Sequence, residues 1–180
     1  DIAGVDGRYM NDGKWVDKQP MEQTPTAADR DILQDKELGF RVLDLTSDPF
    51  NSARASFFHR SVGGYHGAKL GRYQEVIDKH LSKFNAGVYA ALNTRYVIYN
   101  GEALAAEAVT GVSPYGAAWL VDSVVRCDEP ADELAALGDY SLQNSAIVNS
   151  QVEGLADSYS AEGDIELVEY APHRLTYKYS

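Results

Sequence analysis

The sequence predicts a mixed α/β (α+β) domain, in which a mixed β-sheet is flanked by helices and the chain ends in a β-rich segment. Amphipathic helical segments alternate along the chain with short runs of β-branched and aromatic residues, a pattern typical of α/β folds. One run contains Asn100-Gly101, and Asn-Gly is the strongest short signal for a hairpin turn. We expect a single domain over residues 1–180, with residues 1–23 as an irregular arm on its surface.

The first elements are a capped helix and a strand. Residues 24–36 contain Thr26 as the predicted N-cap and Asp29 three residues later, which is the spacing of a capping box. Residues 40–47 alternate apolar and polar side chains and predict a strand. Asp48-Pro49 should end this strand, because proline cannot donate a hydrogen bond to a sheet.

A second helix is predicted from Leu70 onward, because apolar residues recur at helical spacing along one stripe. The stripe consists of Leu70, Tyr73, Val76, Ile77, Leu81 and Phe84. Residues 95–106 follow as two strands that are joined by the Asn100-Gly101 turn.

The second half of the chain predicts a further helix among strands. Residues 116–126 are apolar on both faces, which predicts a central strand. Residues 127–138 predict a helix with Pro130 in its first turn and Gly138 at its end. The last predicted strands are residues 145–150, 164–170 and 174–179.

The charge of the chain argues against nucleic acid as a partner. The formal net charge is −11, whereas a phosphate backbone selects basic surfaces. No stretch approaches ~18 consecutive apolar residues, so the sequence predicts no membrane-spanning helix. The sequence opens without an initiator Met or a secretion signal, and we therefore expect a piece of a longer protein.

The stretch SVGGYHGAKLGRYQEVIDKHL, residues 61–81, is the best candidate for a site. Glycines and potential cations stand here at the start of the predicted helix, where unpaired backbone N–H groups favour an anion. Any ligand held here should be anionic or a sugar that carries phosphate. The candidate ligand-binding residues are His59, Tyr65, His66, Lys69 and Arg72.

A simpler interpretation of the same stretch is structural. Gly63-Gly64 would form a tight turn, and the cations would occupy the solvent side of an amphipathic helix. The stretch does not match a phosphate-binding P-loop, because Lys69 does not directly follow Gly67 and Leu70 replaces the hydroxyl residue. The histidines lack the spacing of metal ligands, so neither a metal nor a cofactor is expected.

One long block of the sequence resembles a known family. The block RVLDLTSDPFNSARASFFHRSVGGYHGAKLGRYQEVIDKHL, residues 41–81, is similar to the YfhO-type bacterial membrane proteins, particularly those of Bacteroides-like bacteria. Shorter blocks follow in the family's order: GRYMNDGKWV (7–16), TPTAADRDIL (24–33), LNTRYVIYNG (92–101), GAAWLVDSV (116–124) and DELAAL (132–137). One departure is Ala117, which stands where the family pattern has Asn.

Proteins of this family are polytopic, with a large extracytoplasmic region, and resemble glycosyltransferases that use polyprenyl-phosphate sugar donors. The resemblance implies that this chain is the extracytoplasmic (periplasmic) part of such a protein, at the outer face of the bacterial inner membrane. The implied partners are the membrane-embedded remainder of the same protein and a glycan or polyprenyl-phosphate sugar. The catalytic residues would lie outside this chain.

We therefore expect the chain to support glycosyl transfer from a lipid-linked sugar to a cell-surface glycan or polymer, either by positioning the acceptor or by scaffolding the catalytic part. On this hypothesis the chain alone is not a complete enzyme. Two alternatives stay open. One is a free-standing soluble α/β enzyme with a site around His59, His66 and Lys69, and the other is an interaction module.

Overall fold

The first helix begins at a capping box, as the sequence predicts. The structure is a computed structural model that describes residues 23–180, so nearly all of the predicted arm over residues 1–23 lies outside the described part. Helix α2 (Ala27–Ile32) follows Thr26, whose hydroxyl accepts a hydrogen bond from the backbone of Asp29. The Asp29 carboxylate in turn accepts one from the backbone N–H of Thr26. The predicted N-cap is confirmed, although the helix is shorter than predicted.

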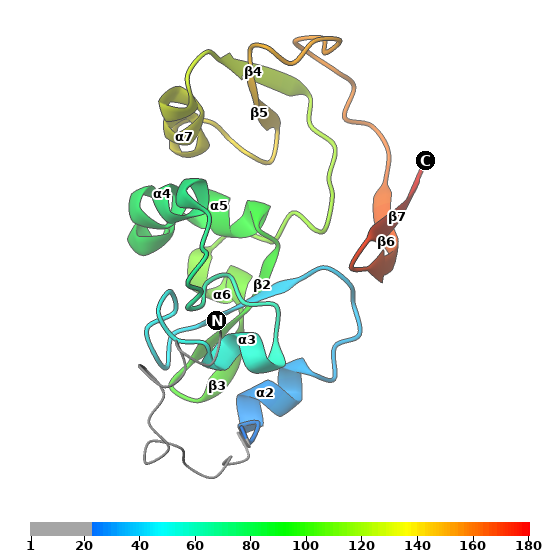
Figure 1. The fold of residues 1–180 in the computed structure, drawn as a ribbon. Coiled ribbons are helices and arrows are strands. Elements are labelled where there is room, and N and C mark those ends of the chain that lie inside the picture. Colours follow the sequence, from blue (N-terminus) through cyan, green and yellow to red (C-terminus); the bar gives the residue numbers. More distant parts are fainter. Residues whose placement is uncertain (1–22) are drawn as a thin grey trace, which may run out of the picture.

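A three-stranded sheet lies in the lower half of Figure 1. Its strands are β1 (Arg41–Asp44), β2 (Thr94–Tyr99) and β3 (Glu102–Ala105), in the order β1-β2-β3. β1 runs parallel to β2, whereas β2 runs antiparallel to β3. Asn100 and Gly101 between β2 and β3 have φ values of 50° and 84°, which are the left-handed values of a type I′ turn. The predicted hairpin is therefore confirmed.

Helices connect β1 to β2, because parallel neighbours need a crossover. They are α3 (Arg54–Phe58), α4 (Gly71–Lys79), the 3₁₀ helix η2 (Leu81–Lys83) and α5 (Ala86–Ala91). The prediction of one continuous helix from Leu70 to Phe84 is wrong at both ends. Leu70 is 76% exposed, and Phe84 adopts a left-handed φ of 54°. The Asn85 side chain caps α5, so a new helix starts where the predicted stripe would have continued.

Two apolar clusters cover the two faces of the three-stranded sheet. One consists of Ala28, Ile32, Val42 and Ile98, from α2, β1 and β2. The other joins the sheet to α4, η2 and α5, and its buried members include Leu43, Ile77, Leu81, Val88, Tyr89 and Val97. Val42 and Leu43 are neighbours in β1 but belong to different clusters. The sheet is therefore covered by helices on both faces, and side chains of both orientations are buried.

A βαβ unit lies at the other end of the molecule in Figure 1, after the short helix α6 (Ala106–Thr110). It consists of β4 (Ser123–Cys127), α7 (Pro130–Asp139) and β5 (Ser145–Asn149), and its two strands are parallel. The predicted strand over residues 116–126 is wrong in its first half, because residues 116–122 are not part of a strand.

The prediction that this strand is central is also wrong. β4 pairs with β5 along one edge, and on its other edge only Ser123 forms a bridge, to Ser158. Pro130 is the first residue of α7, as predicted. Gly138 lies inside α7, one residue before its end, and packs close to His80. A Cβ at Gly138 would lie 3.0 Å from His80 Cε1.

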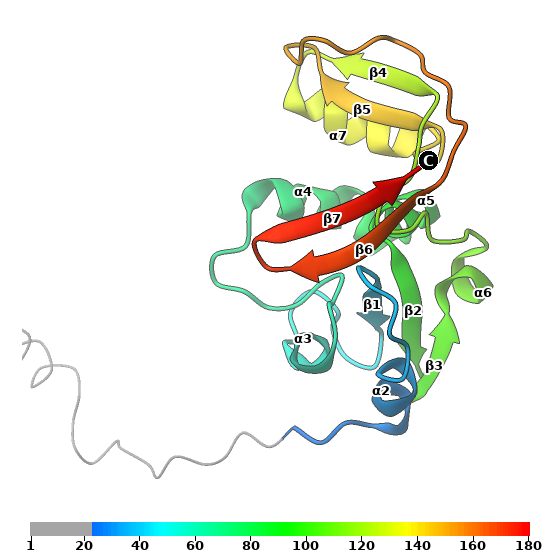
Figure 2. The same cartoon turned by 90° about the vertical axis from the view of Figure 1, so that its right-hand side faces the viewer.

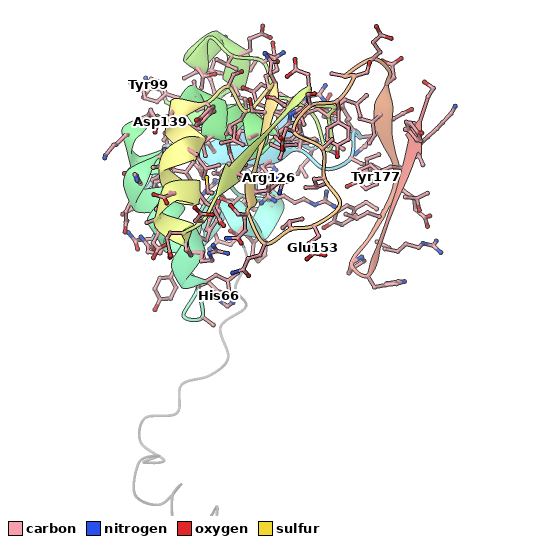
Figure 3. The ribbon with its side chains drawn as sticks, turned by 90° about the horizontal axis from the view of Figure 1, so that it is seen from above. His66, Tyr99, Arg126, Asp139, Glu153 and Tyr177 are labelled. Atoms are coloured by element: carbon pink, nitrogen blue, oxygen red, sulfur yellow. The ribbon has the colours of Figure 1, made fainter. Side chains whose placement is uncertain are left out.

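The chain ends in a hairpin of β6 (Ile165–Ala171) and β7 (Arg174–Tyr179), which confirms the predicted β-rich end. Figure 2 shows this hairpin in front of the rest of the molecule, and Figure 1 shows it at one side. Its register places six apolar side chains on one face, namely Ile165, Leu167, Tyr170, Leu175, Tyr177 and Tyr179. The opposite face carries Glu166, Glu169, Thr176 and Lys178. In Figure 3, Tyr177 points from the hairpin toward the rest of the molecule. The predicted mixed α/β class is confirmed, with the strands divided among three small sheets.

Candidate functional site

A buried charge cluster joins α2, β1 and α3. Arg54, the first residue of α3, forms ion pairs with Asp29 and Asp44, whose side chains are 0% and 1% exposed. The Asp44 carboxylate lies 3.0 Å from Arg54 Nη1 and also accepts a hydrogen bond from the backbone of Thr46. His59, which follows α3, places its Nε2 2.9 Å from the second carboxylate oxygen of Asp29. The cluster therefore ties three elements together through one guanidinium.

The electrostatics of the cluster keep both ends of the ion pair charged. Burial alone would raise the pKa of the Asp29 carboxyl, but hydrogen bonds from Arg54 and Thr26 outweigh that effect and lower the pKa well below its usual 3.8. The hydrogen bond to Asp29 raises the pKa of Arg54. Buried charges persist in proteins when they are paired and hydrogen-bonded in this way.

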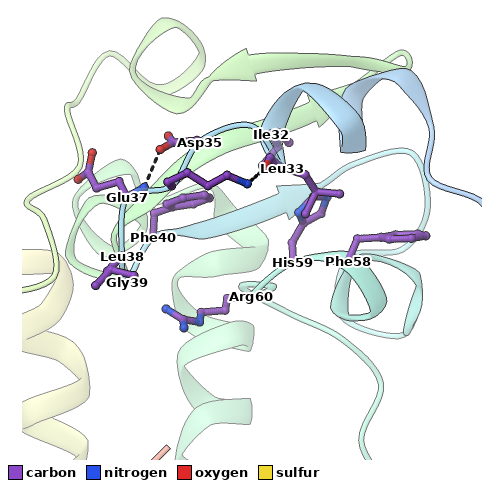
Figure 4. Close-up of a pocket in the computed structure, with 11 residues that line it drawn as sticks. Ile32, Leu33, Asp35, Glu37, Leu38, Gly39, Phe40, Phe58, His59 and Arg60 are labelled. Atoms are coloured by element: carbon purple, nitrogen blue, oxygen red, sulfur yellow. Dashed lines mark hydrogen bonds between the residues drawn. The ribbon is translucent and has the colours of Figure 1, made fainter. Parts of the chain in front are cut away.

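His59 stands between this cluster and a cavity of about 300 Å³, which we call the His59 cavity. Figure 4 shows His59 pointing from the end of α3 toward Leu33 at the end of α2, with Phe40 just before β1. The side chain of His59 is only 3% exposed, and its Nε2 is engaged by Asp29. Besides His59, the polar lining residues are Asp35, Lys36, Glu37 and Arg60.

Most of these polar groups already have partners. Asp35 and Glu37 both pair with Arg95, and the Lys36 ammonium donates to the Leu33 carbonyl at 2.7 Å. Arg60 differs from the other three, because its guanidinium leaves the cavity and reaches the C-terminal hairpin.

The guanidinium of Arg60 lies over the ring of Tyr170, with Cζ 3.6 Å from the ring centroid. Tyr170 lines a second cavity of about 190 Å³ beneath the apolar face of the hairpin, which we call the hairpin cavity. Gly39 lines both cavities. The two cavities therefore adjoin each other at Gly39, and the contact between Arg60 and Tyr170 links a wall of one to a wall of the other.

Gly39 is required at this junction for two reasons. Its φ of +85° is left-handed, which favours glycine. A Cβ at this position would also lie 2.9 Å from Ala117 Cβ and 3.1 Å from Leu167 Cδ2. The hairpin and the segment around residue 117 thus approach the backbone closely where the cavities meet.

The cations that the sequence singles out in residues 61–81 have partners elsewhere in the protein. The Lys69 ammonium donates to the backbone carbonyl of Phe50 at 3.0 Å, and Arg72 pairs with Glu133 of α7 at 2.9 Å. Helix α4 begins after Leu70, whose side chain makes no capping hydrogen bond. Lys69 and Arg72 therefore brace the start of α4 against a loop and against α7.

The remaining candidates of this stretch lie in an exposed turn. Tyr65 is 68% exposed, and His66 Nδ1 accepts a hydrogen bond from the backbone of Ala68 at 3.1 Å. Gly64 has a φ of +115°, which confirms that the turn uses a positive φ at one of its two adjacent glycines. Of the five candidates, His59 alone lines the His59 cavity, and none of the five lines the hairpin cavity.

Sequence reasoning missed Arg54 and Asp44, and it assigned Asp29 only a capping role. The sequence does contain a sign that Asp44 could be buried and paired: it directly follows Val42 and Leu43, an apolar pair in a predicted strand. No local signal pairs it with Arg54, which lies 10 residues away and comes into contact only through the fold.

Comparison with protein-family models, with curated proteins and with solved structures finds no match to this chain. Among residues 23–180, no three His, Cys, Asp or Glu side chains gather as ligands for a metal ion. None of the helices in the same range has the length and hydropathy needed to cross a membrane.

Proposed function

We propose that this chain positions an acceptor glycan for a membrane-embedded glycosyltransferase of the YfhO type, on the extracytoplasmic side of the membrane. The observation that carries this proposal is the contact between Arg60 and Tyr170 where the His59 cavity and the hairpin cavity adjoin. Adjoining cavities suit a ligand made of linked units, with one unit in each. A glycan is such a ligand.

The side chains along this path have the mixed character that a sugar needs. A sugar ring presents C–H groups on its faces and hydroxyl groups at its edge. Tyr170 and Tyr177 in the hairpin cavity offer an aromatic face together with a hydroxyl. Phe40 and Phe58 add apolar surface in the His59 cavity, beside the charged group of Lys36.

The hairpin also leaves surface for contact with the remainder of a longer protein. Tyr170, Leu175 and Tyr177 are 40–48% exposed, and Tyr179 is 77% exposed. A two-stranded sheet is marginally stable by itself and gains stability when its apolar face is covered. A membrane-embedded part of the same protein would cover the end of the hairpin around Tyr179, which lines neither cavity, and would hold the domain near the catalytic residues.

The alternative of a free-standing enzyme around His59, His66 and Lys69 has less support. His59 is engaged by the buried Asp29, and Lys69 is bound to the Phe50 carbonyl. His66 lies in the exposed turn. These three side chains therefore have separate partners and do not share a cavity.

The glycan-binding proposal is tested with the 180-residue chain on an array of bacterial cell-surface glycans, followed by titration of the best oligosaccharide. Tyr170→Ala and Tyr177→Ala should each weaken binding about tenfold, because each removes an aromatic wall. Tyr65→Ala is the matched control, since Tyr65 is exposed but lies in the turn after β1 and α3. Binding that falls with Tyr65→Ala and survives the other two changes would place the site in residues 61–81 and overturn the proposed location. The absence of any glycan binding would overturn the function.

The attachment to a membrane protein is tested separately. The reading frame that contains these residues should encode a run of hydrophobic helices on the same polypeptide. A photo-crosslinker at Tyr179 in that full-length protein should then yield an intramolecular product. A reading frame without membrane helices would contradict this part of the proposal.

A further inference from the structure

Two neighbouring buried side chains carry polar atoms without a hydrogen-bond partner. Among the described residues, these atoms are Asn93 Nδ2 and Thr94 Oγ1. Asn93 is 6% exposed and Thr94 is 2% exposed. Buried donors without a partner are rare and costly in folded proteins, so each one needs an explanation.

Asn93 lines the hairpin cavity, and Arg41 lines it as well. The two residues are held side by side, because the backbone N–H of Arg41 donates to the Asn93 carbonyl at 2.9 Å. Arg41 is exposed and forms no ion pair within residues 23–180. The Arg41 guanidinium and the buried Asn93 amide therefore both belong to residues that line this cavity, and neither has a protein partner among the described side chains.

The charge around the cavity is unusual for this protein. The whole chain has a net charge of −11, yet the described lining of the hairpin cavity includes Arg41 and no Asp or Glu. Arg60 adds a second guanidinium at the edge, over the ring of Tyr170. Donors without acidic neighbours, in a site of limited volume, match a ligand with an anionic group.

The opposite wall of the cavity is apolar. It comes from Leu167, Tyr170, Leu175 and Tyr177 of the hairpin. This wall would pack against a ring that carries C–H groups, whereas a bare inorganic anion would leave it unused.

We propose that the hairpin cavity binds an anionic sugar, with its carboxylate or phosphate on Arg41 and the Asn93 amide and its ring against the tyrosines of the hairpin. This inference rests on the proposed glycan-binding function and adds the charge of the sugar and the residues that recognise it. The buried amide of Asn93 gains the partner that it lacks. The anionic group of the sugar would lie on the sheet side, where Arg41 and Asn93 are. Its ring would lie on the hairpin side, against the tyrosines.

The experiment titrates the 180-residue chain with glucuronate, glucose 1-phosphate and glucose, and follows backbone amide shifts by NMR. Glucose is the neutral control, and the two anionic sugars distinguish a carboxylate from a phosphate ester. We expect at least one anionic sugar to bind about tenfold more tightly than glucose, because a charge-assisted hydrogen bond contributes about that factor. The largest shifts should fall at residues 39–41, 91–93 and 167–177.

Two variants then assign the donors. Arg41→Gln and Asn93→Gly should each weaken the anionic sugar about tenfold and leave glucose unchanged. Glycine is chosen because Asn93 has a left-handed φ of 53°, which glycine adopts without strain. Lys178→Gln is the matched control, since Lys178 lies on the opposite face of the same hairpin. An unchanged fluorescence and circular dichroism spectrum confirms that each variant is folded.

Several outcomes would overturn the inference. One is equal affinity for all three sugars. Another is tight binding of the anionic sugar that survives both Arg41→Gln and Asn93→Gly. If oligosaccharides from the array still bind in either case, the proposed function stands and only the anionic site is wrong. If no oligosaccharide binds, the function itself fails.

Discussion

Gly63 packs against the carbonyl oxygen of Pro49 so closely that a Cβ at position 63 would lie 2.0 Å from that oxygen. The next residue, Gly64, donates its backbone N–H to the same carbonyl at 2.8 Å. The turn after β1 and α3 is therefore held against the Asp48–Pro49 segment by close backbone contacts.

The first prediction concerns this contact. Gly63→Ala should lower the free energy of unfolding by about 3 kcal/mol, because backbone rather than a flexible side chain must move. Gly67→Ala is the matched control in the same stretch, since a Cβ there would meet no atom within 4 Å. Urea unfolding of both variants checks the prediction, and equal midpoints would contradict it.

The buried charge cluster predicts a specific dependence on pH. Asp29→Asn should cost about 3 kcal/mol at pH 7, because Arg54 would lose one of its two buried carboxylates. The folded-state pKa of Asp29 lies below its usual 3.8, so its stabilisation is complete above that value and is lost as the pH falls further. The difference in unfolding free energy between the wild type and Asp29→Asn should therefore shrink below about pH 4.

The control for this prediction is Asp31→Asn, which changes an exposed carboxylate on the same helix. Its stability should follow that of the wild type across the whole pH range. Chemical unfolding at a series of pH values measures all three proteins. If the stability difference between the wild type and Asp29→Asn widens as the pH falls, the lowered pKa of Asp29 is wrong.

The contact between Arg60 and Tyr170 predicts how firmly the hairpin is held. Arg60→Ala should weaken the docking of β6 and β7 by about 1 kcal/mol, the usual size of a cation–π contact at a partly exposed site. Amide protection in the hairpin should then fall about fivefold in hydrogen exchange. Arg30→Ala removes an exposed guanidinium from α2 and should leave the hairpin amides unchanged. If the hairpin amides exchange at the same rate in Arg60→Ala and Arg30→Ala, the contact between Arg60 and Tyr170 contributes nothing to the docking of the hairpin.

The last prediction concerns the cations at the start of α4. The double change Lys69→Ala and Arg72→Ala should cost less than about 1 kcal/mol, because Arg72 is 71% exposed and surface ion pairs contribute little. Glycan binding should also be unchanged, since both cations are already engaged by Phe50 and Glu133. A folded double variant that loses glycan binding would show that residues 61–81 are the site after all.

The elements that the sequence predicts correctly are those set by local chemistry. The capping box at Thr26, the type I′ turn at Asn100-Gly101 and the helix that starts at Pro130 each depend on residues within a few positions of one another. The helical spacing of apolar residues predicts the ends of a helix less reliably. The stripe from Leu70 to Phe84 continues through a break in the helix, because apolar residues of α4 and η2 enter the same core from two separate helices.

The candidate site was less predictable, because its parts meet only in the folded chain. Asp29 and Arg54 are 25 residues apart. Asn93 and Tyr177 share a cavity only because the C-terminal hairpin lies over the start of β2. The apolar run at residues 116–122 predicts a strand by its composition, yet Trp119 donates its indole N–H to the Leu142 carbonyl and packs against Tyr115 instead. Contacts of this range leave no pattern in a single sequence.

The parallel pairing of β1 with β2 has a consequence for the synthesis of the protein. Residues 45–93 separate the two strands, so until the ribosome has released β2 the only pairing open to β1 among the described residues is the single bridge between Val42 and Ser61. During that interval Val42 and Leu43, both almost fully buried in the finished fold, face water. Closing so long a loop before β1 can pair along its length with β2 is slow, and it leaves an apolar strand open to aggregation. A nascent chain that ends before Tyr99 is therefore the species most in need of a chaperone.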